Sequence, residues 1–199
     1  MDKSKTLHVT SRAEWRAWLS EHYRSEKEVW LVFYKKHTGK PRVSYNDAVE
    51  EALCFGWIDS TANTIDADRY MQRFSPRRPK SSYSQANRER LSALIKQGKV
   101  VQDVLAALPD AAKSKSKVKV EGESWTDFDP PADIIEAIKA SPEAWKNFQG
   151  FSPSYIRIRL AYIDDVRRRP EEFAKRLRNF VKMTEKGKQI GFGGIDKYY

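Results

Sequence analysis

The first half of the chain alternates short apolar runs with segments of helical periodicity. Residues 7–9 and 29–34 are rich in β-branched and aromatic side chains, which favours strands. Residues 69–74 follow the pattern of a strand that has one packed face and one basic face. These three runs predict a small sheet.

Capping residues mark the helices that connect these strands. Ser11 precedes a segment in which Trp15 and Leu19 recur at helical spacing, and Glu14 completes a capping box with it. Ser44 opens a second helix, because an N-cap hydroxyl can accept a hydrogen bond from a free backbone N–H of the first turn. Strands and helices in this order predict an α+β domain.

A proline-containing segment and a third helix complete the first half. Residues 75–80 hold two prolines, which argues against regular structure there. Ser82 and Gln85 have the spacing of a capping box, so we expect a helix over residues 83–97 that stops at Gly98.

Beyond residue 131 the pattern is helical throughout. Prolines stand where first helical residues belong, because the proline ring pre-sets the helical φ and lacks an N–H that the first turn would leave unpaired. These prolines are Pro131, Pro142, Pro153 and Pro170. The last helix has an apolar stripe formed by Phe173, Leu177, Phe180 and Thr184. We therefore expect a small bundle of about four helices.

Composition divides the chain into three parts. Residues 109–130 alternate lysine with serine and then become acidic, a pattern typical of a linker. We predict an α+β domain over residues 1–108, with a small mixed or antiparallel sheet flanked by helices. An all-helical module is predicted over residues 131–199.

Several functional classes are disfavoured by composition. No apolar run approaches the roughly 20 residues that span a bilayer, and residues 1–5 lack the apolar core of a secretory signal. Cys54 is the one cysteine and the three histidines are scattered, so we predict no disulfide, no metal site and no cofactor. We expect a cytoplasmic protein.

The charge of the chain points to an anionic ligand. The net charge is +10, and residues 69–99 hold nine basic residues against one acid. A helix N-terminus presents free backbone N–H groups, and arginines beside it can grip a phosphate or carboxylate in a bidentate fashion. The predicted anion-binding residues are Arg69, Arg73, Arg77, Arg78, Ser82, Ser84 and Asn87.

Plainer interpretations of this segment stay open. Ser82 can serve only as a helix cap, and Asp59 can pair with an arginine merely to fix the loop. A basic surface can also serve solubility alone. If the segment is catalytic, Asp59 is the candidate general base beside the arginines.

Two stretches of the sequence are specific enough to indicate a family. They are Cys54-Phe55-Gly56-Trp57-Ile58-Asp59 and Phe74-Ser75-Pro76-Arg77. The chain resembles, over nearly its whole length, the YdeI/OmpD-associated family, also described as bacteriocin-protection proteins. Residues 131–188 are similar to the helical domain of that family. The resemblance implies the same two-part architecture and an association with envelope stress or bacteriocin protection, and it implies no established enzyme chemistry.

We therefore predict a non-enzymatic module that binds an anionic ligand, either nucleic acid or a phosphorylated or carboxylated molecule. The first alternative is an enzyme that acts on a small anionic substrate through Asp59 and the arginine cluster. The second is a stress-linked adaptor that binds a protein partner through the C-terminal helices.

Overall fold

The computed structural model describes residues 6–78, 81–109, 128–191 and 195–198. The chain divides into two compact units. The first consists of Met1–Ser82 and Leu91–Lys115, and the second of Tyr83–Arg90 and Ser116–Tyr199. The predicted linker, residues 109–130, lies outside the described residues except at its two ends.

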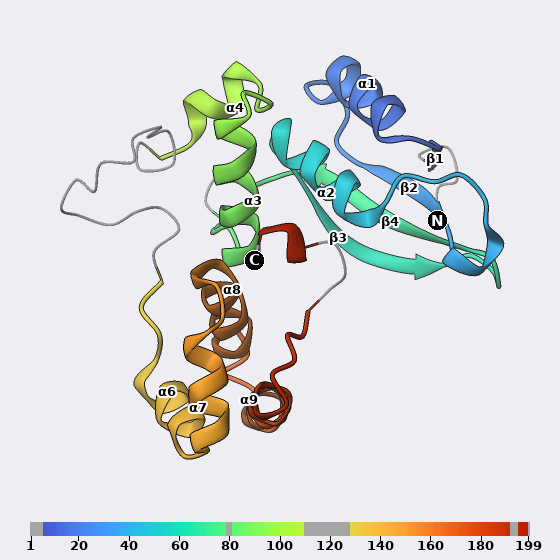
Figure 1. Ribbon diagram of the computed structural model, residues 1–199. Helices are drawn as coiled ribbons and strands as arrows, with labels where there is room; N and C mark the ends of the chain where they lie inside the picture. The colour runs from blue at the N-terminus through green and yellow to red at the C-terminus, as the bar shows by residue number, and fades with distance from the viewer. Residues whose placement is uncertain (1–5, 79–80, 110–127, 192–194, 199) are drawn as a thin grey trace. The chain divides into compact units, whose positions relative to one another are not determined.

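The described part of the first unit is built on a four-stranded mixed sheet (Figure 1). The strands are β1 (Thr6–His8), β2 (Val29–Tyr34), β3 (Trp57–Thr64) and β4 (Arg69–Pro76), in the order β1-β2-β4-β3. β1 runs parallel to β2, whereas β2 and β3 each pair antiparallel with β4. β4 is therefore a central strand, with a neighbour on each side.

Helices α1 (Arg12–His22) and α2 (Tyr45–Cys54) begin at the predicted hydroxyl caps. The hydroxyls of Ser11 and Ser44 each accept a hydrogen bond from the backbone N–H three residues later, at 3.2 and 3.1 Å. These bonds satisfy N–H groups that the first helical turn leaves without an intrahelical partner.

The core of the first unit joins α1 and α2 to the sheet. The Trp15 side chain is fully buried, and its ring centroid lies 5.3 Å from that of Phe74 in β4. Trp15 Nε1 donates a hydrogen bond to the carbonyl oxygen of Ala48 in α2 at 3.0 Å. One indole of α1 thus contacts both the sheet and the second helix. The large side chains buried with it include Leu19, Leu31, Phe33, Leu53 and Trp57.

Two element boundaries differ from the prediction. β4 continues to Pro76, where a missing N–H is tolerated because the strand ends there. Helix α3 (Gln85–Lys96) begins two residues later than expected, because the hydroxyl of Ser84, and not that of Ser82, accepts the backbone N–H of Asn87 at 3.3 Å. The boundary between the two units falls inside α3, after Arg90.

Two short helices complete the described part of the first unit. A 3-10 turn spans Lys36–Thr38. Helix α4 (Gln102–Ala107) follows α3 after Gly98, whose positive φ of 67° suits the expected stop signal.

The second unit is helical in its described part. The elements are the first half of α3, α6 (Ala132–Lys139), α7 (Pro142–Gln149), α8 (Pro153–Asp164), α9 (Pro170–Glu185) and the 3-10 turn Asp196–Tyr198. The buried core contains Tyr155, Ile163 and Phe180, together with residues of α6 and α7. Pro131 is the N-cap of α6 and not its first residue, whereas the other three predicted prolines begin helices.

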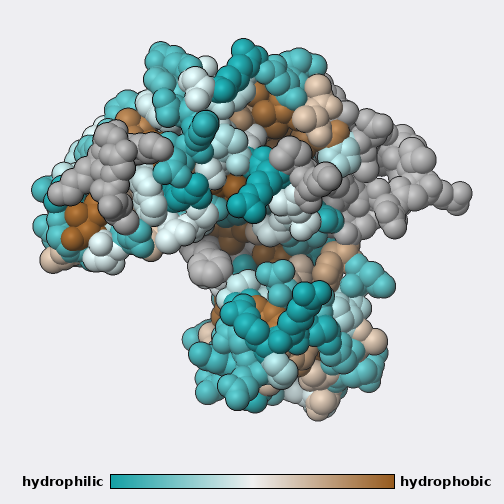
Figure 2. Space-filling view, turned by 180° about the vertical axis from the view of Figure 1, so that it is seen from behind, coloured by the Kyte–Doolittle hydropathy of each residue, from teal (hydrophilic) through white to brown (hydrophobic). Residues whose placement is uncertain are grey.

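The predicted fold class is confirmed, with a mixed sheet flanked by helices in the first unit and helices alone in the described second unit. In the described ranges, no helix combines the length and apolar character that a bilayer crossing requires. On the face shown in Figure 2, hydrophilic surface predominates and hydrophobic surface forms scattered patches.

Candidate functional site

Two of the predicted arginines are engaged by carboxylates. Arg69 Nη2 lies 2.7 Å from Asp66 Oδ2, and Arg73 Nη2 lies 2.6 Å from Glu28 Oε2. The hydrogen bond from Arg69 holds the pKa of Asp66 below its ordinary value, which keeps this carboxylate charged. An incoming anion would have to compete with these carboxylates for both guanidinium groups.

The other predicted residues of the first unit follow β4. Arg77 is half-buried, and its backbone N–H donates to the carbonyl oxygen of Gly56 at 2.9 Å. Arg78 and Ser82 are exposed. The segment is therefore anchored by its backbone at Arg77 to the residue that precedes β3.

The last two predicted residues, Ser84 and Asn87, belong to the second unit. Ser84 caps α3, so its hydroxyl already accepts a backbone N–H. Asn87 is 7% exposed, and its Oδ1 accepts a hydrogen bond from Arg90 Nη1 at 2.9 Å. The predicted set is thus divided between the two units, and both members in the second unit have local partners.

Asp59 is held by neutral donors. Its Oδ2 accepts hydrogen bonds from the Tyr45 hydroxyl at 2.7 Å and from Gln72 Nε2 at 3.3 Å. Among the described residues Asp59 forms no ion pair with an arginine, and Arg73 pairs with Glu28 instead. Asp59 links α2 to the sheet, since Tyr45 is the first residue of α2 and Gln72 lies in β4.

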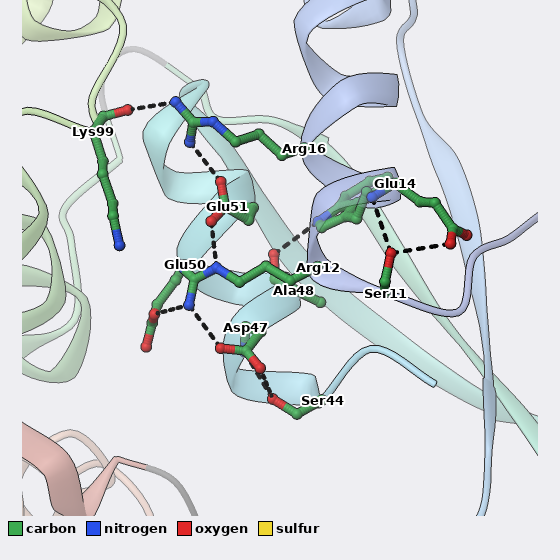
Figure 3. Close-up of polar contacts among 11 residues, drawn as sticks. Ser11, Arg12, Glu14, Arg16, Ser44, Asp47, Ala48, Glu50, Glu51 and Lys99 are labelled. Atoms are coloured by element: carbon green, nitrogen blue, oxygen red, sulfur yellow. Dashed lines mark hydrogen bonds and ion pairs between the residues drawn. The ribbon is translucent and has the colours of Figure 1, made fainter. Parts of the chain in front are cut away.

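An ionic network that the sequence analysis missed joins α1 to α2 (Figure 3). Arg12 Nη1 donates to Asp47 at 2.7 Å and to Glu50 at 3.0 Å, and Arg12 Nε donates to Glu51. Burial by itself lowers the pKa of Arg12, but the hydrogen bond and charge of Glu51 and its neighbours raise that pKa overall. The sequence does indicate such a network, because Asp47 and Glu51 are four residues apart and therefore lie on one side of α2.

Arg16 extends the network along α1. It donates to Glu51 at 2.5 Å and to the carbonyl oxygen of Lys99 at 3.0 Å, as Figure 3 shows. Cys54 lies at the end of α2, and its burial, followed by the charge of Glu51, raises the pKa of its thiol to about 11. A thiol held neutral at physiological pH is a poor nucleophile, so Cys54 serves packing. The network engages both arginines with three carboxylates of the same unit, which suits a structural role.

Helices α8 and α9 of the second unit line a pocket of about 300 Å³. This volume lies at the lower end of the range for small-molecule sites. Its lining carries three cations and one carboxylate, so the pocket is positive by two charges. The lining residues are Arg159, Tyr162 and Ile163 of α8, Glu172, Lys175, Arg176, Asn179 and Phe180 of α9, and Ile190.

Arg159 is the most unusual residue of this pocket. It is 5% exposed, and its Nε is buried without a hydrogen-bond partner. The arginines that form ion pairs in the described part of this unit are Arg157, Arg167 and Arg176, and Arg159 is not among them. Its guanidinium carbon lies 5.5 Å from the centre of the Tyr162 ring. A guanidinium stays charged at any physiological pH, so its burial without an anion is costly.

Arg176 is fixed in position beside the same pocket. Its Nε donates to Glu172 at 2.9 Å, and this hydrogen bond lowers the pKa of Glu172. A guanidinium held by its Nε edge is pre-oriented, so binding a further anion would cost less side-chain entropy.

The sequence carried one signal for this pocket. Tyr155, Arg159 and Ile163 recur at a spacing of four, so the arginine falls on the side of α8 that carries buried apolar residues. A charged residue at such a position needs a partner or a ligand. Among the described residues, no group of His, Cys, Asp and Glu side chains is arranged to hold a metal ion.

Two family models match the chain. Residues 7–107 match a family described as a domain of unknown function (DUF8412). Residues 127–187 match a family described as "Bacteriocin-protection, YdeI or OmpD-Associated". No curated protein and no solved structure matches.

The expected resemblance is thus confirmed over residues 127–187, whereas the motifs quoted from the first half fall under the separate model. The first match covers about half of the chain and coincides with the mixed-sheet part of the fold. The protein belongs to the family of the DUF8412 domain, and its residues 127–187 are similar to the YdeI/OmpD-associated family.

Proposed function

We propose that this protein is a binding module for a small anionic molecule, which the pocket between α8 and α9 receives. The buried guanidinium of Arg159 carries this proposal, since it lines the pocket and forms no ion pair within the described residues. An anion seated against Arg159 would supply the missing counter-charge. The Tyr162 ring offers only a cation–π contact, worth about 0.5–2 kcal/mol in general.

The lining also restricts the class of ligand. Arg159, Lys175 and Arg176 suit a carboxylate or a monophosphate, because guanidinium groups bind both in a bidentate manner. Ile163 and Phe180 provide apolar wall beside these cations. A compact anion with an apolar body therefore fits better than an equally charged anion that is polar throughout.

The test compares the unfolding temperature of the full chain with and without added anions, at constant ionic strength. The probes are inorganic phosphate, acetate and benzoate, with chloride as the reference. A ligand at 100 times its Kd stabilises a protein by about 2.7 kcal/mol, which a melting curve resolves easily. We expect benzoate or phosphate to stabilise the wild type more than chloride does.

Two variants assign the effect to the pocket. Arg159→Met removes the buried charge while keeping an unbranched side chain, and it should abolish the stabilisation by anions. Arg168→Gln removes an exposed arginine that does not line the pocket, and it should leave the stabilisation unchanged. Equal anion responses in wild type and Arg159→Met, or no anion response in the wild type, would refute the proposal.

The description of the matched family suggests bacteriocin protection as the physiological setting. We propose that ligand binding in the pocket is required for such protection. Cells that lack the gene should become sensitive to bacteriocins, and Arg168→Gln should restore resistance where Arg159→Met does not. Equal rescue by both variants would separate the pocket from that phenotype.

A further inference from the structure

The exposed side of α9 carries a regular series of cations. Lys175, Arg178, Lys182 and Lys186 are all exposed and are spaced by three, four and four residues. That spacing places them on one side of the helix, over a length of about 16 Å at 1.5 Å per residue. Phe180 and Thr184 are buried on the opposite side. We call these four cations the α9 basic face.

The cations of the α9 basic face are not matched by ion pairs. The ion pair within α9 joins Arg176 to Glu172, and none of the four cations takes part in an ion pair within the described residues. Two exposed acids, Glu171 and Glu185, lie near the ends of the helix. The face therefore keeps a positive field that can attract a polyanion.

The neighbouring side chains restrict the kind of polyanion. The exposed residues of α9 include no aromatic or aliphatic side chain apart from Pro170, because Phe173, Leu177 and Val181 pack against the core of the unit. A membrane-binding amphipathic helix needs an available apolar face, and a single-strand binder needs exposed rings for stacking. The remaining way for this face to bind a polyanion is contact between its cations and regularly spaced phosphates.

We infer that the α9 basic face binds the phosphate backbone of a nucleic-acid duplex without reading its sequence. A duplex carries one negative charge per about 1.7 Å of its axis, so about 16 Å of helix meets more phosphates than its four cations can neutralise. This inference goes beyond the proposed small-anion function and uses other residues, because Lys175 alone belongs to both sites.

The test is fluorescence anisotropy of the full chain with a labelled duplex of arbitrary sequence, at about 50 and about 200 mM salt. Neutralising three to four phosphates predicts a slope of log K against log salt near −3, hence an affinity loss of about 60-fold between the two conditions. The variant Arg178→Gln/Lys182→Gln/Lys186→Gln leaves the pocket lining intact. We expect it to bind at least about 10-fold more weakly at low salt and to lose most of the salt slope.

A matched control removes the same charge elsewhere. Lys27→Gln/Lys36→Gln/Lys96→Gln alters three exposed lysines of the first unit and should weaken binding by less than about threefold. Equal losses in both triple variants would show that net charge, and not the α9 basic face, drives binding. Failure to bind duplex at low salt, or tighter α9-dependent binding to phosphatidylglycerol vesicles, would overturn the inference. Anions should still stabilise the variant Arg178→Gln/Lys182→Gln/Lys186→Gln against unfolding. That stabilisation would show that the variant is folded and that its loss of duplex binding is independent of the pocket.

Discussion

Arg176 contacts Tyr162 at two points. Its guanidinium carbon lies 3.8 Å from the centre of the ring, and its Nη1 donates a hydrogen bond to the Tyr162 carbonyl oxygen at 2.8 Å. The ring therefore helps to hold a pocket cation in place. Replacing Tyr162 with leucine removes the ring and should weaken anion binding about two- to fivefold, which corresponds to a cation–π contact of about 0.5–1 kcal/mol. Tyr162→Phe keeps the ring and should retain the affinity, as titration calorimetry with the best probe anion can show. Equal weakening in both variants would assign the effect to the hydroxyl.

Glu51 should be essential to the stability of the first unit. Its carboxylate is 2% exposed and accepts hydrogen bonds from both Arg12 and Arg16. Glu51→Ala removes one partner from each of two guanidinium groups, which are about a third exposed and keep other acceptors, and it should lower the free energy of unfolding by about 1–3 kcal/mol. The control is Glu21→Ala on the exposed side of α1, which should change it by less than about 0.5 kcal/mol. Urea denaturation measures both, and a similar small effect of the two variants would contradict a stabilising role for the network.

Cys54 should make the protein less stable at alkaline pH. The unfolded thiol ionises near its ordinary pKa of 9.0, whereas the folded thiol ionises at about 11. Between these values only the unfolded chain loses its proton, so stability is complete below pH 9 and falls as the pH rises toward 11. The loss attributable to Cys54 approaches about 2–3 kcal/mol, at 1.36 kcal/mol per pKa unit.

The pH effect is isolated by comparison with Cys54→Ala. Its unfolding free energy, measured by urea denaturation at several alkaline pH values, should fall less steeply than that of the wild type, because other titrating groups cancel in the difference. Parallel pH profiles would mean that the Cys54 pKa is not raised in the folded state.

The start of α3 provides a test of helix capping. Ser84→Ala removes the hydroxyl that accepts the Asn87 N–H and should lower the free energy of unfolding by about 1 kcal/mol. Ser82→Ala removes an exposed hydroxyl two residues earlier and should have almost no effect. The reverse ranking would restore the cap position expected from the sequence.

Local patterns predicted much of the fold because each depends on neighbouring residues. Ser11 and Ser44 cap helices, and residues 29–34 form a strand, since capping and alternation act within one turn or one strand. The start of α3 was misplaced because Ser82 and Ser84 both have the chemistry of a cap, and spacing alone favoured the wrong one.

The candidate sites were harder to predict because they depend on long-range contacts. Arg73 pairs with Glu28, 45 residues away, and no local rule announces that partner. Arg159 was not predicted because the sequence pattern favours the dense group of arginines at residues 69–78. In the folded protein, Arg69 and Arg73 of that group are paired with carboxylates. The burial of Arg159, and not the number of cations, distinguishes the pocket from the basic segment at residues 69–78.

The division of α3 has a consequence for how the helical domain can be separated from the chain. Glu89 lies within the stretch matched by the first family, yet it packs in the second unit, where its Oε1 accepts a hydrogen bond from Arg157 Nε at 2.6 Å. A fragment cut at the family boundary, such as residues 127–199, would take Arg157 without its carboxylate. An autonomous helical domain should therefore include residues 83–90, either fused or added as a peptide, and relatives that carry the domain alone should have another counter-ion at this point.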